Sequence, residues 1–106
     1  MPVKILRAAE WEAFQRDGSF AGSADDVRDG FIHLSMPEQV EGTLARHFAG
    51  EDGLVLIDIA IADDPALRHE ASRGGALFPH LYRPLTLSDV KGARPLASGA
   101  KPGYQR

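Results

Sequence analysis

The sequence predicts one small α+β domain, and three observations support this prediction. Short segments with the composition of strands alternate irregularly with segments of helical periodicity, which favours α+β over a regular parallel α/β fold. The chain has 106 residues, close to the most common domain size. Its residues are 43% hydrophobic and 25% charged, as in ordinary globular proteins. We expect residues 1–97 to form the domain, with small twisted antiparallel or mixed sheets and two main helices, and residues 98–106 to form a loose tail.

The first predicted elements are a strand over residues 3–6 and a helix over residues 8–16. The helix is indicated by Trp11 and Phe14, which lie three positions apart and therefore on one face. Gly18 follows and is expected to end this helix, because glycine readily adopts the left-handed backbone of a C-terminal cap.

Residues 19–30 are rich in small and acidic side chains and are typical of turns. Ser23 precedes Asp26 by three positions, which is the spacing of a capping box and indicates one helical turn in the middle of this stretch. The apolar segment that follows, residues 31–35, predicts a buried strand.

The second main helix is expected to begin directly after this strand. Ser35 and Glu38 have capping-box spacing, and Pro37 occupies the first turn, where its missing N–H costs nothing. Gly50 is expected to end the segment. Residues that share one face at helical spacing are Val40, Leu44, His47 and Phe48.

The clearest strand covers residues 54–61. Its nearly continuous apolar and β-branched composition indicates a central position in a sheet. Asp64 and Pro65 then resemble a cap followed by a first-turn proline, so we expect a brief helical turn up to residue 67.

The last third of the chain shows no clear periodicity at first. We expect residues 68–85 to be irregular, because Pro79 and Pro84 exclude a long helix. A turn is predicted over residues 88–90 and a last short strand over residues 93–96.

Composition excludes several classes of protein. The chain has no cysteine, so it has no disulfide, thiolate metal ligand or cysteine nucleophile, which fits a reducing compartment. The N-terminus has no apolar signal segment. The longest apolar run, residues 54–62, is interrupted by Asp58 and is too short to span a bilayer. We therefore expect a cytoplasmic protein with no membrane partner.

The charge distribution and the absent motifs narrow the function further. The chain carries 12 basic and 15 acidic side chains, a net charge of −3, without a run of Lys or Arg. This argues against broad nucleic-acid binding, although a local basic spot can hold a phosphate. Neither a Gly-rich phosphate loop nor a dinucleotide fingerprint occurs, and the Gly-x-Ser-x-Gly elbow of serine hydrolases is absent.

His33 and Ser35 are the first candidate site residues. Strand alternation puts Ile32 and Leu34 on one face and the two polar residues on the other. In one interpretation both side chains point into a cleft beside helix N–H groups that attract anions. In the other, His33 is a core histidine bonded to backbone and Ser35 is only a helix cap.

The second candidate is the turn formed by Ser72, Arg73, Gly74 and Gly75. Adjacent glycines let a ligand approach the main chain closely. The guanidinium of Arg73 offers planar donors that suit phosphate or carboxylate. The alternative is a flexible turn carrying a solvated arginine.

Three further polar residues surround this turn in the sequence. Glu70 lies shortly before it, and His80 and Tyr82 follow it. His80 can act as an acid or base near neutral pH, and Tyr82 can stack on a ring or donate its hydroxyl, but both are also ordinary in a core. A metal site using His33, His69, Glu70 and His80 is an arithmetic alternative without the spacing of a known zinc motif, so we predict no metal.

Several motifs together resemble the domain of unknown function 952 family, over about residues 3–97. One position departs from the pattern, because His69 stands where the family usually has tryptophan, which removes a stacking role there. The motifs are Trp11-Glu12, Gly22-Ser23, Asp29-Gly30-Phe31-Ile32-His33-Leu34-Ser35, Gln39-Val40, Thr43-Leu44, His47-Phe48-Ala49-Gly50, Glu70-Ala71-Ser72-Arg73-Gly74-Gly75 and Phe78-Pro79-His80-Leu81-Tyr82.

The resemblance implies more about fold than about activity. The family is distantly similar to the ADP-ribosyltransferase-like fold, whose members bind NAD or an ADP-ribose-like ligand in a cleft between two small sheets. In that superfamily an early strand carries a His or Arg that contacts the adenosine ribose, which His33 and Ser35 match. Neither Glu70 nor His80 is assigned to the later polar role. RNA 2′-phosphotransferases share the fold, so Arg73 and His80 do not select one reaction.

Three hypotheses follow. The first is a transferase-type enzyme that binds NAD or a related nucleotide: His33 and Ser35 hold a ribose, Arg73 contacts a phosphate, and His80 or Glu70 acts as general base or positions an acceptor. The second is a non-catalytic module that binds a small anionic metabolite or a partner. The third is structural, with these residues forming a buried hydrogen-bond network that fixes the fold.

Overall fold

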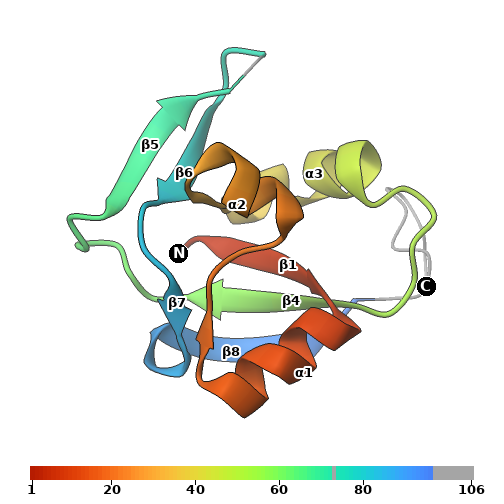
Figure 1. Ribbon diagram of the computed structural model, residues 1–106. Coiled ribbons are helices and arrows are strands. Elements are labelled where there is room, and N and C mark those ends of the chain that lie inside the picture. Colours follow the sequence, from red (N-terminus) through yellow and green to blue (C-terminus); the bar gives the residue numbers. More distant parts are fainter. Residues whose placement is uncertain (73, 97–106) are drawn as a thin grey trace.

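The structure, a computed structural model, describes residues 1–72 and 74–96 (Figure 1). Arg73 and the predicted tail, residues 98–106, lie outside the described residues. The helices are α1 (Ala8–Asp17), α2 (Ala24–Asp29) and α3 (Val40–His47), with single 3₁₀ turns at η1 (Pro37–Gln39) and η2 (Leu87–Asp89). The strands are β1 (Val3–Arg7), β2 (Ser19–Phe20), β3 (Ile32–His33), β4 (Leu54–Ile59), β5 (Leu67–Ala71), β6 (Leu77–Leu81), β7 (Leu85–Thr86) and β8 (Val90–Pro95).

The described residues confirm the α+β class, with three small sheets and two main helices, α1 and α3. The sheets have the strand orders β1-β4-β8, β2-β7 and β3-β6-β5. Every strand pairing among the described residues is antiparallel, so the mixed-sheet option is not realised there. An isolated bridge between Val3 and Ser35 joins the free edge of β1 to the segment after β3. No helix among the described residues has the length and apolarity that crossing a membrane requires.

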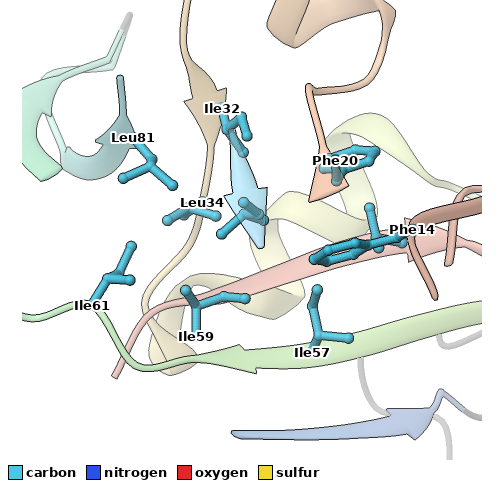
Figure 2. Close-up of a cluster of buried hydrophobic side chains, with 10 residues drawn as sticks. Phe14, Phe20, Ile32, Leu34, Ile57, Ile59, Ile61 and Leu81 are labelled. Atoms are coloured by element: carbon cyan, nitrogen blue, oxygen red, sulfur yellow. The ribbon is translucent and has the colours of Figure 1, made fainter. Parts of the chain in front are cut away.

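The strand predicted to be central is central: β4 lies between β1 and β8. Its successive side chains point to opposite faces, so its continuous apolar run supplies two cores. The first core, shown in Figure 2, lies beneath α1 and the smaller sheets and contains Leu6, Phe14, Phe20, Ile32, Leu34, Ile57, Ile59, Ile61, Leu81 and Leu85. The second lies between the large sheet and α3 and contains Val3, Ile5, Leu44, Leu54 and Leu56.

The local signals before residue 31 predicted the end of α1 and the cap of α2, but not the short strand β2. The helix α1 ends at Gly18, which has a φ of 80° in the left-handed region. Ser23 caps α2, because its backbone N–H donates to the Asp26 carboxylate and its hydroxyl accepts from Asp26 N. The helix is longer than the single turn predicted and ends at Gly30.

The predicted start of the second helix is wrong by one residue. Met36, not Ser35, precedes the first turn, and its backbone N–H donates to Gln39 Oε1 at 2.9 Å. Pro37 occupies the first position as expected, but that turn is 3₁₀ and α3 begins only at Val40. Ser35 is therefore free of capping, and its hydroxyl bonds Thr43 Oγ1 at 2.9 Å.

The irregular segment predicted from residue 68 is a β-hairpin instead. β5 and β6 pair over five residues, and Figure 1 shows this hairpin projecting from the body of the domain. The helical turn predicted to follow Pro65 is a non-helical turn leading into β5. Pro79 is tolerated inside β6 because of its position opposite the end of β3. Its carbonyl accepts from Leu34 N, and its missing N–H faces the same side, where β3 has already ended. The strand predicted over residues 31–35 is accordingly only two residues long.

Candidate functional site

The β3-β6-β5 sheet gathers the predicted histidines on one face. His33 of β3 pairs in register with His80 of β6, and their ring centroids lie 5.7 Å apart. On β5, Glu70 pairs with Phe78, two residues from His80. Because side chains alternate along a strand, Glu70, Phe78 and His80 share one face, while His69 of β5 points to the other.

A pocket of about 400 Å³ lies against this face. Its walls come from α2, α3, the free edge of β1 and the β3-β6-β5 sheet. The polar and aromatic residues that line it are Lys4, Ser23, Asp25, Asp26, Arg28, Asp29, His33, Ser35, Thr43, Arg46, His47, Phe48, Ser72, Phe78 and His80. The volume falls within the range of small-molecule sites.

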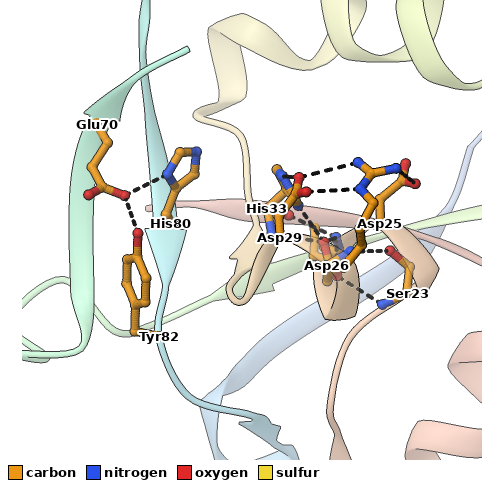
Figure 3. Close-up of polar contacts among 10 residues, drawn as sticks. Ser23, Asp25, Asp26, Asp29, His33, Glu70, His80 and Tyr82 are labelled. Atoms are coloured by element: carbon orange, nitrogen blue, oxygen red, sulfur yellow. Dashed lines mark hydrogen bonds and ion pairs between the residues drawn. The ribbon is translucent and has the colours of Figure 1, made fainter.

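His33 lies between two carboxylates of α2 (Figure 3). Its Nδ1 is 2.6 Å from Asp26 Oδ1, and its Nε2 is 3.0 Å from Asp29 Oδ2. Each ring nitrogen of His33 therefore faces a carboxylate oxygen, and neither nitrogen is left free for a ligand. The side chain of His33 is still 38% exposed and forms part of the pocket wall.

Asp26 is the centre of a buried ionic network. It is 2% exposed and also accepts from Lys4 Nζ at 3.0 Å, while Lys4 Nζ donates to the backbone carbonyl of His33 at 2.8 Å. Burial by itself raises the pKa of Asp26, but the hydrogen bond from His33 and the charge of Lys4 outweigh it and hold this pKa well below its ordinary value. Gly22 makes room for the Asp26 side chain, because a Cβ there would lie 2.6 Å from Asp26 Cβ.

Glu70 orients the second histidine. Its Oε1 is 2.8 Å from His80 Nδ1 and accepts from the Tyr82 hydroxyl at 2.7 Å, as Figure 3 shows. The hydrogen bond from Tyr82, followed by that from His80, lowers the pKa of Glu70, and the same contact raises the pKa of Tyr82. A carboxylate at Nδ1 keeps the proton on that nitrogen, so the neutral ring carries its lone pair at Nε2.

His80 is packed tightly but remains accessible from the pocket. The Phe31 ring stacks on it with centroids 4.0 Å apart, and Phe31 also contacts the rings of His33 and Tyr82. The side chain of His80 is 10% exposed. Among the described residues no hydrogen-bond partner reaches Nε2, which lies on the ring edge away from Glu70. This nitrogen is therefore available to a ligand.

The predicted site residues fall into three groups. His33, Ser35, Ser72 and His80 line one pocket. Glu70 and Tyr82 lie behind His80 and contact it or its carboxylate partner. Gly74 and Gly75 form the tip of the β5–β6 hairpin and do not line the pocket; Gly75 N donates to Ser72 O within this turn, with a φ of 90°. The prediction for Arg73 lies outside the described residues.

Two other expectations concern the remaining histidines. His47, predicted at a core edge, is exposed on α3. The alternative metal site is wrong in its ligand set, because His69 points to the face opposite Glu70. Among the described residues no group of three His, Cys, Asp or Glu side chains is placed to hold a metal ion.

Sequence reasoning missed Lys4, Asp26, Asp29 and Arg46 as site residues. A signal existed for the first, because Lys4 is the one charged side chain inside the otherwise apolar Val3-Lys4-Ile5-Leu6 segment. The Ser23–Asp26 spacing identified Asp26 only as a cap. Its contacts with His33 and Lys4 span 7 and 22 positions, and no local pattern predicts them.

The ionic network makes the free energy of unfolding depend on pH. The Asp26 carboxyl binds its proton at lower pH in the folded state than in the unfolded state, so the unfolded state binds more protons and stability rises with pH. We expect the free energy of unfolding to fall as pH drops below about 4, the ordinary range of a carboxyl group. Urea unfolding followed by circular dichroism between pH 2 and 7 tests this.

The control is Asp26→Asn, which removes the titrating group at this position. Its unfolding free energy should be lower at neutral pH and should change less between pH 4 and 2 than that of the wild type. Equal acid slopes for the two proteins would contradict the assignment.

Comparison with known proteins assigns this chain to a family. The sequence matches the family described as "Protein of unknown function (DUF952)" over residues 5–93. The crystal structure of protein CC0527 from Caulobacter crescentus is similar, with 50% identity, a TM-score of 0.85 and coverage of 92% of this chain and 90% of that chain. The solution NMR structure of CC0527 gives 50% identity, a TM-score of 0.80 and coverage of 90% and 83%. A search of curated proteins gave no match. The chain belongs to the DUF952 family.

Proposed function

We propose that this protein binds a small anionic metabolite of the nucleotide type and transfers a group from it, with His80 as the general acid–base. The observation that carries the proposal is the orientation of His80. Glu70 holds its Nδ1 at 2.8 Å, no described residue bonds the opposite nitrogen, and His80 lines a pocket of ligand size.

The chemistry of His80 follows from this orientation. With the proton held at Nδ1, Nε2 accepts a proton from a substrate hydroxyl or water and returns it to a leaving group. Tyr82 and His80 donate to the same oxygen of Glu70, which fixes the carboxylate in one position. The stacked ring of Phe31 fixes the plane of the imidazole.

His33 has a different role in this proposal. Both of its nitrogens face carboxylates, so its ring forms part of the pocket wall and does not transfer protons. NAD and ADP-ribose are the first ligands we propose, because the resemblance to ADP-ribosyltransferase-like proteins and the position of His33 and Ser35 in one pocket both favour a ribose-containing anion.

A non-catalytic binding module is the second candidate. The pairing of His33 favours it, because a ring with a carboxylate at each nitrogen has no free nitrogen for proton transfer. If the protein is an enzyme, proton transfer depends on His80 alone, so a direct test of that residue separates the two functions.

The test measures binding by isothermal titration and product formation by NMR, with NAD, ADP-ribose and a 2′-phosphorylated RNA oligomer as probes. We expect His80→Gln to reduce turnover by about 10²–10⁴-fold while binding is retained. His69→Gln is the matched control, because His69 is an exposed histidine on the opposite face of the same hairpin.

Each outcome decides between the functions. Binding by the wild type without turnover of any probe establishes the binding module. Turnover that His80→Gln leaves at the wild-type rate removes His80 from the mechanism. Absence of binding for all three probes ends the nucleotide proposal.

A further inference from the structure

The α3 wall of the pocket has a different character from the α2 wall. Thr43, Arg46 and His47 occupy positions i, i+3 and i+4 of α3, so they lie on one helical face, and all three line the pocket. Phe48 follows them and also lines it. No carboxylate of α3 lines the pocket, whereas α2 contributes three.

The carboxylates of the α2 wall are paired with neighbouring side chains. Arg28 lies 3.2 Å from Asp25 and 2.9 Å from Asp29. Lys4 and His33 contact Asp26, and His33 also contacts Asp29. The three carboxylates and their three partners thus form one connected network, so these partners are already occupied.

Arg46 is the remaining arginine among the described residues that line the pocket. Across residues 1–72 and 74–96, no ion pair or hydrogen bond joins the Arg46 side chain to another group. A guanidinium binds phosphate through paired N–H donors. His47 adds a further donor beside it, whereas Thr43 is occupied by Ser35 and by Gln39 O.

Building on the proposed function, we propose that Arg46, assisted by His47, binds the phosphate group of the ligand at the α3 wall. The phosphate then lies at the wall away from the carboxylates of α2, and the rest of the ligand extends toward His80 on the sheet wall. Phe48 and Phe78 line the same pocket and supply apolar surface for a ring. This position differs from the hairpin turn that the sequence suggested, where Gly74 and Gly75 do not line the pocket.

The test is a titration of the ¹⁵N-labelled protein with inorganic phosphate, followed by amide chemical shifts, with chloride at equal ionic strength as the blank. In the wild type we expect the largest shifts at residues 43–48. Arg46→Gln should weaken phosphate binding about tenfold, as expected for the loss of one charge-assisted contact. Arg16→Gln is the matched control, because Arg16 is an exposed arginine of α1 that does not line the pocket.

Several results would overturn the proposal: no phosphate-specific shift in the wild type, shifts centred elsewhere, or equal weakening by Arg46→Gln and Arg16→Gln. These results are separate from those that test His80. Nucleotide turnover that is insensitive to Arg46→Gln removes the phosphate site and keeps the proposed function. Phosphate binding at Arg46 without any nucleotide binding keeps the phosphate site and removes the proposed function.

Discussion

Replacing Lys4 with methionine is expected to lower the free energy of unfolding by about 3–5 kcal/mol, because it leaves the buried charge of Asp26 without its ammonium partner. Lys4 is 8% exposed and Asp26 is 2% exposed, so water cannot replace the lost contact. Methionine keeps the length of the side chain but removes its donors. Since domains of this kind unfold with about 5–15 kcal/mol, the loss is a large fraction of total stability. Urea unfolding at pH 7 measures it.

Two variants make this result specific. Lys91→Met changes an exposed lysine in β8 and should alter stability by less than about 0.5 kcal/mol. Adding Asp26→Asn to Lys4→Met should recover part of the loss, because the unpaired charge is then absent. A Lys4→Met protein as stable as the wild type would show that His33 and the backbone N–H groups satisfy Asp26 without Lys4.

Replacing Phe14 with alanine is the second large change, with an expected loss of about 3–5 kcal/mol. Phe14 is 1% exposed and is the only fully buried side chain of α1. Its ring lies 5.6 Å from Trp11 and 5.8 Å from Phe20, and it anchors the helix on the first core (Figure 2). The alanine variant leaves a cavity that the surrounding sheets cannot fill. Thermal and urea unfolding both report the change.

The control for this prediction lies on the same helix. Glu12→Ala removes an exposed side chain and should change stability by less than about 0.5 kcal/mol. Phe14→Leu should cost less than Phe14→Ala, because it leaves a smaller cavity. Similar losses of stability for Phe14→Ala and Glu12→Ala would mean that α1 is held by its own helical contacts and not by the core.

Local signals in the sequence were sufficient where neighbouring residues decide the structure. Gly18 ends α1, and Ser23 caps α2 through Asp26 three positions later. The apolar run of β4 indicated its central place. The capping signal failed at Ser35, where the Val3 bridge and the Thr43 hydroxyl hold this residue in place. Long-range contacts overrode a local preference there.

The hairpin shows the same limit. Pro79 argued only against a long helix, and no strand was predicted around it. It lies in β6, because its missing N–H faces a position where β3 has already ended. The identity of the partner strand decides whether a proline is tolerated, and the sequence of β6 does not specify that partner.

Residue patterns were enough to predict the α+β class, the two main helices and the central strand. They also identified four residues that line the pocket, His33, Ser35, Ser72 and His80. The surroundings of these residues follow from the fold. The histidines have different partners, Asp26 and Asp29 for His33 and Glu70 for His80. No local pattern predicts such partners, because a polar contact depends on distance in space, and the network of Lys4, Asp26 and His33 joins three separate elements.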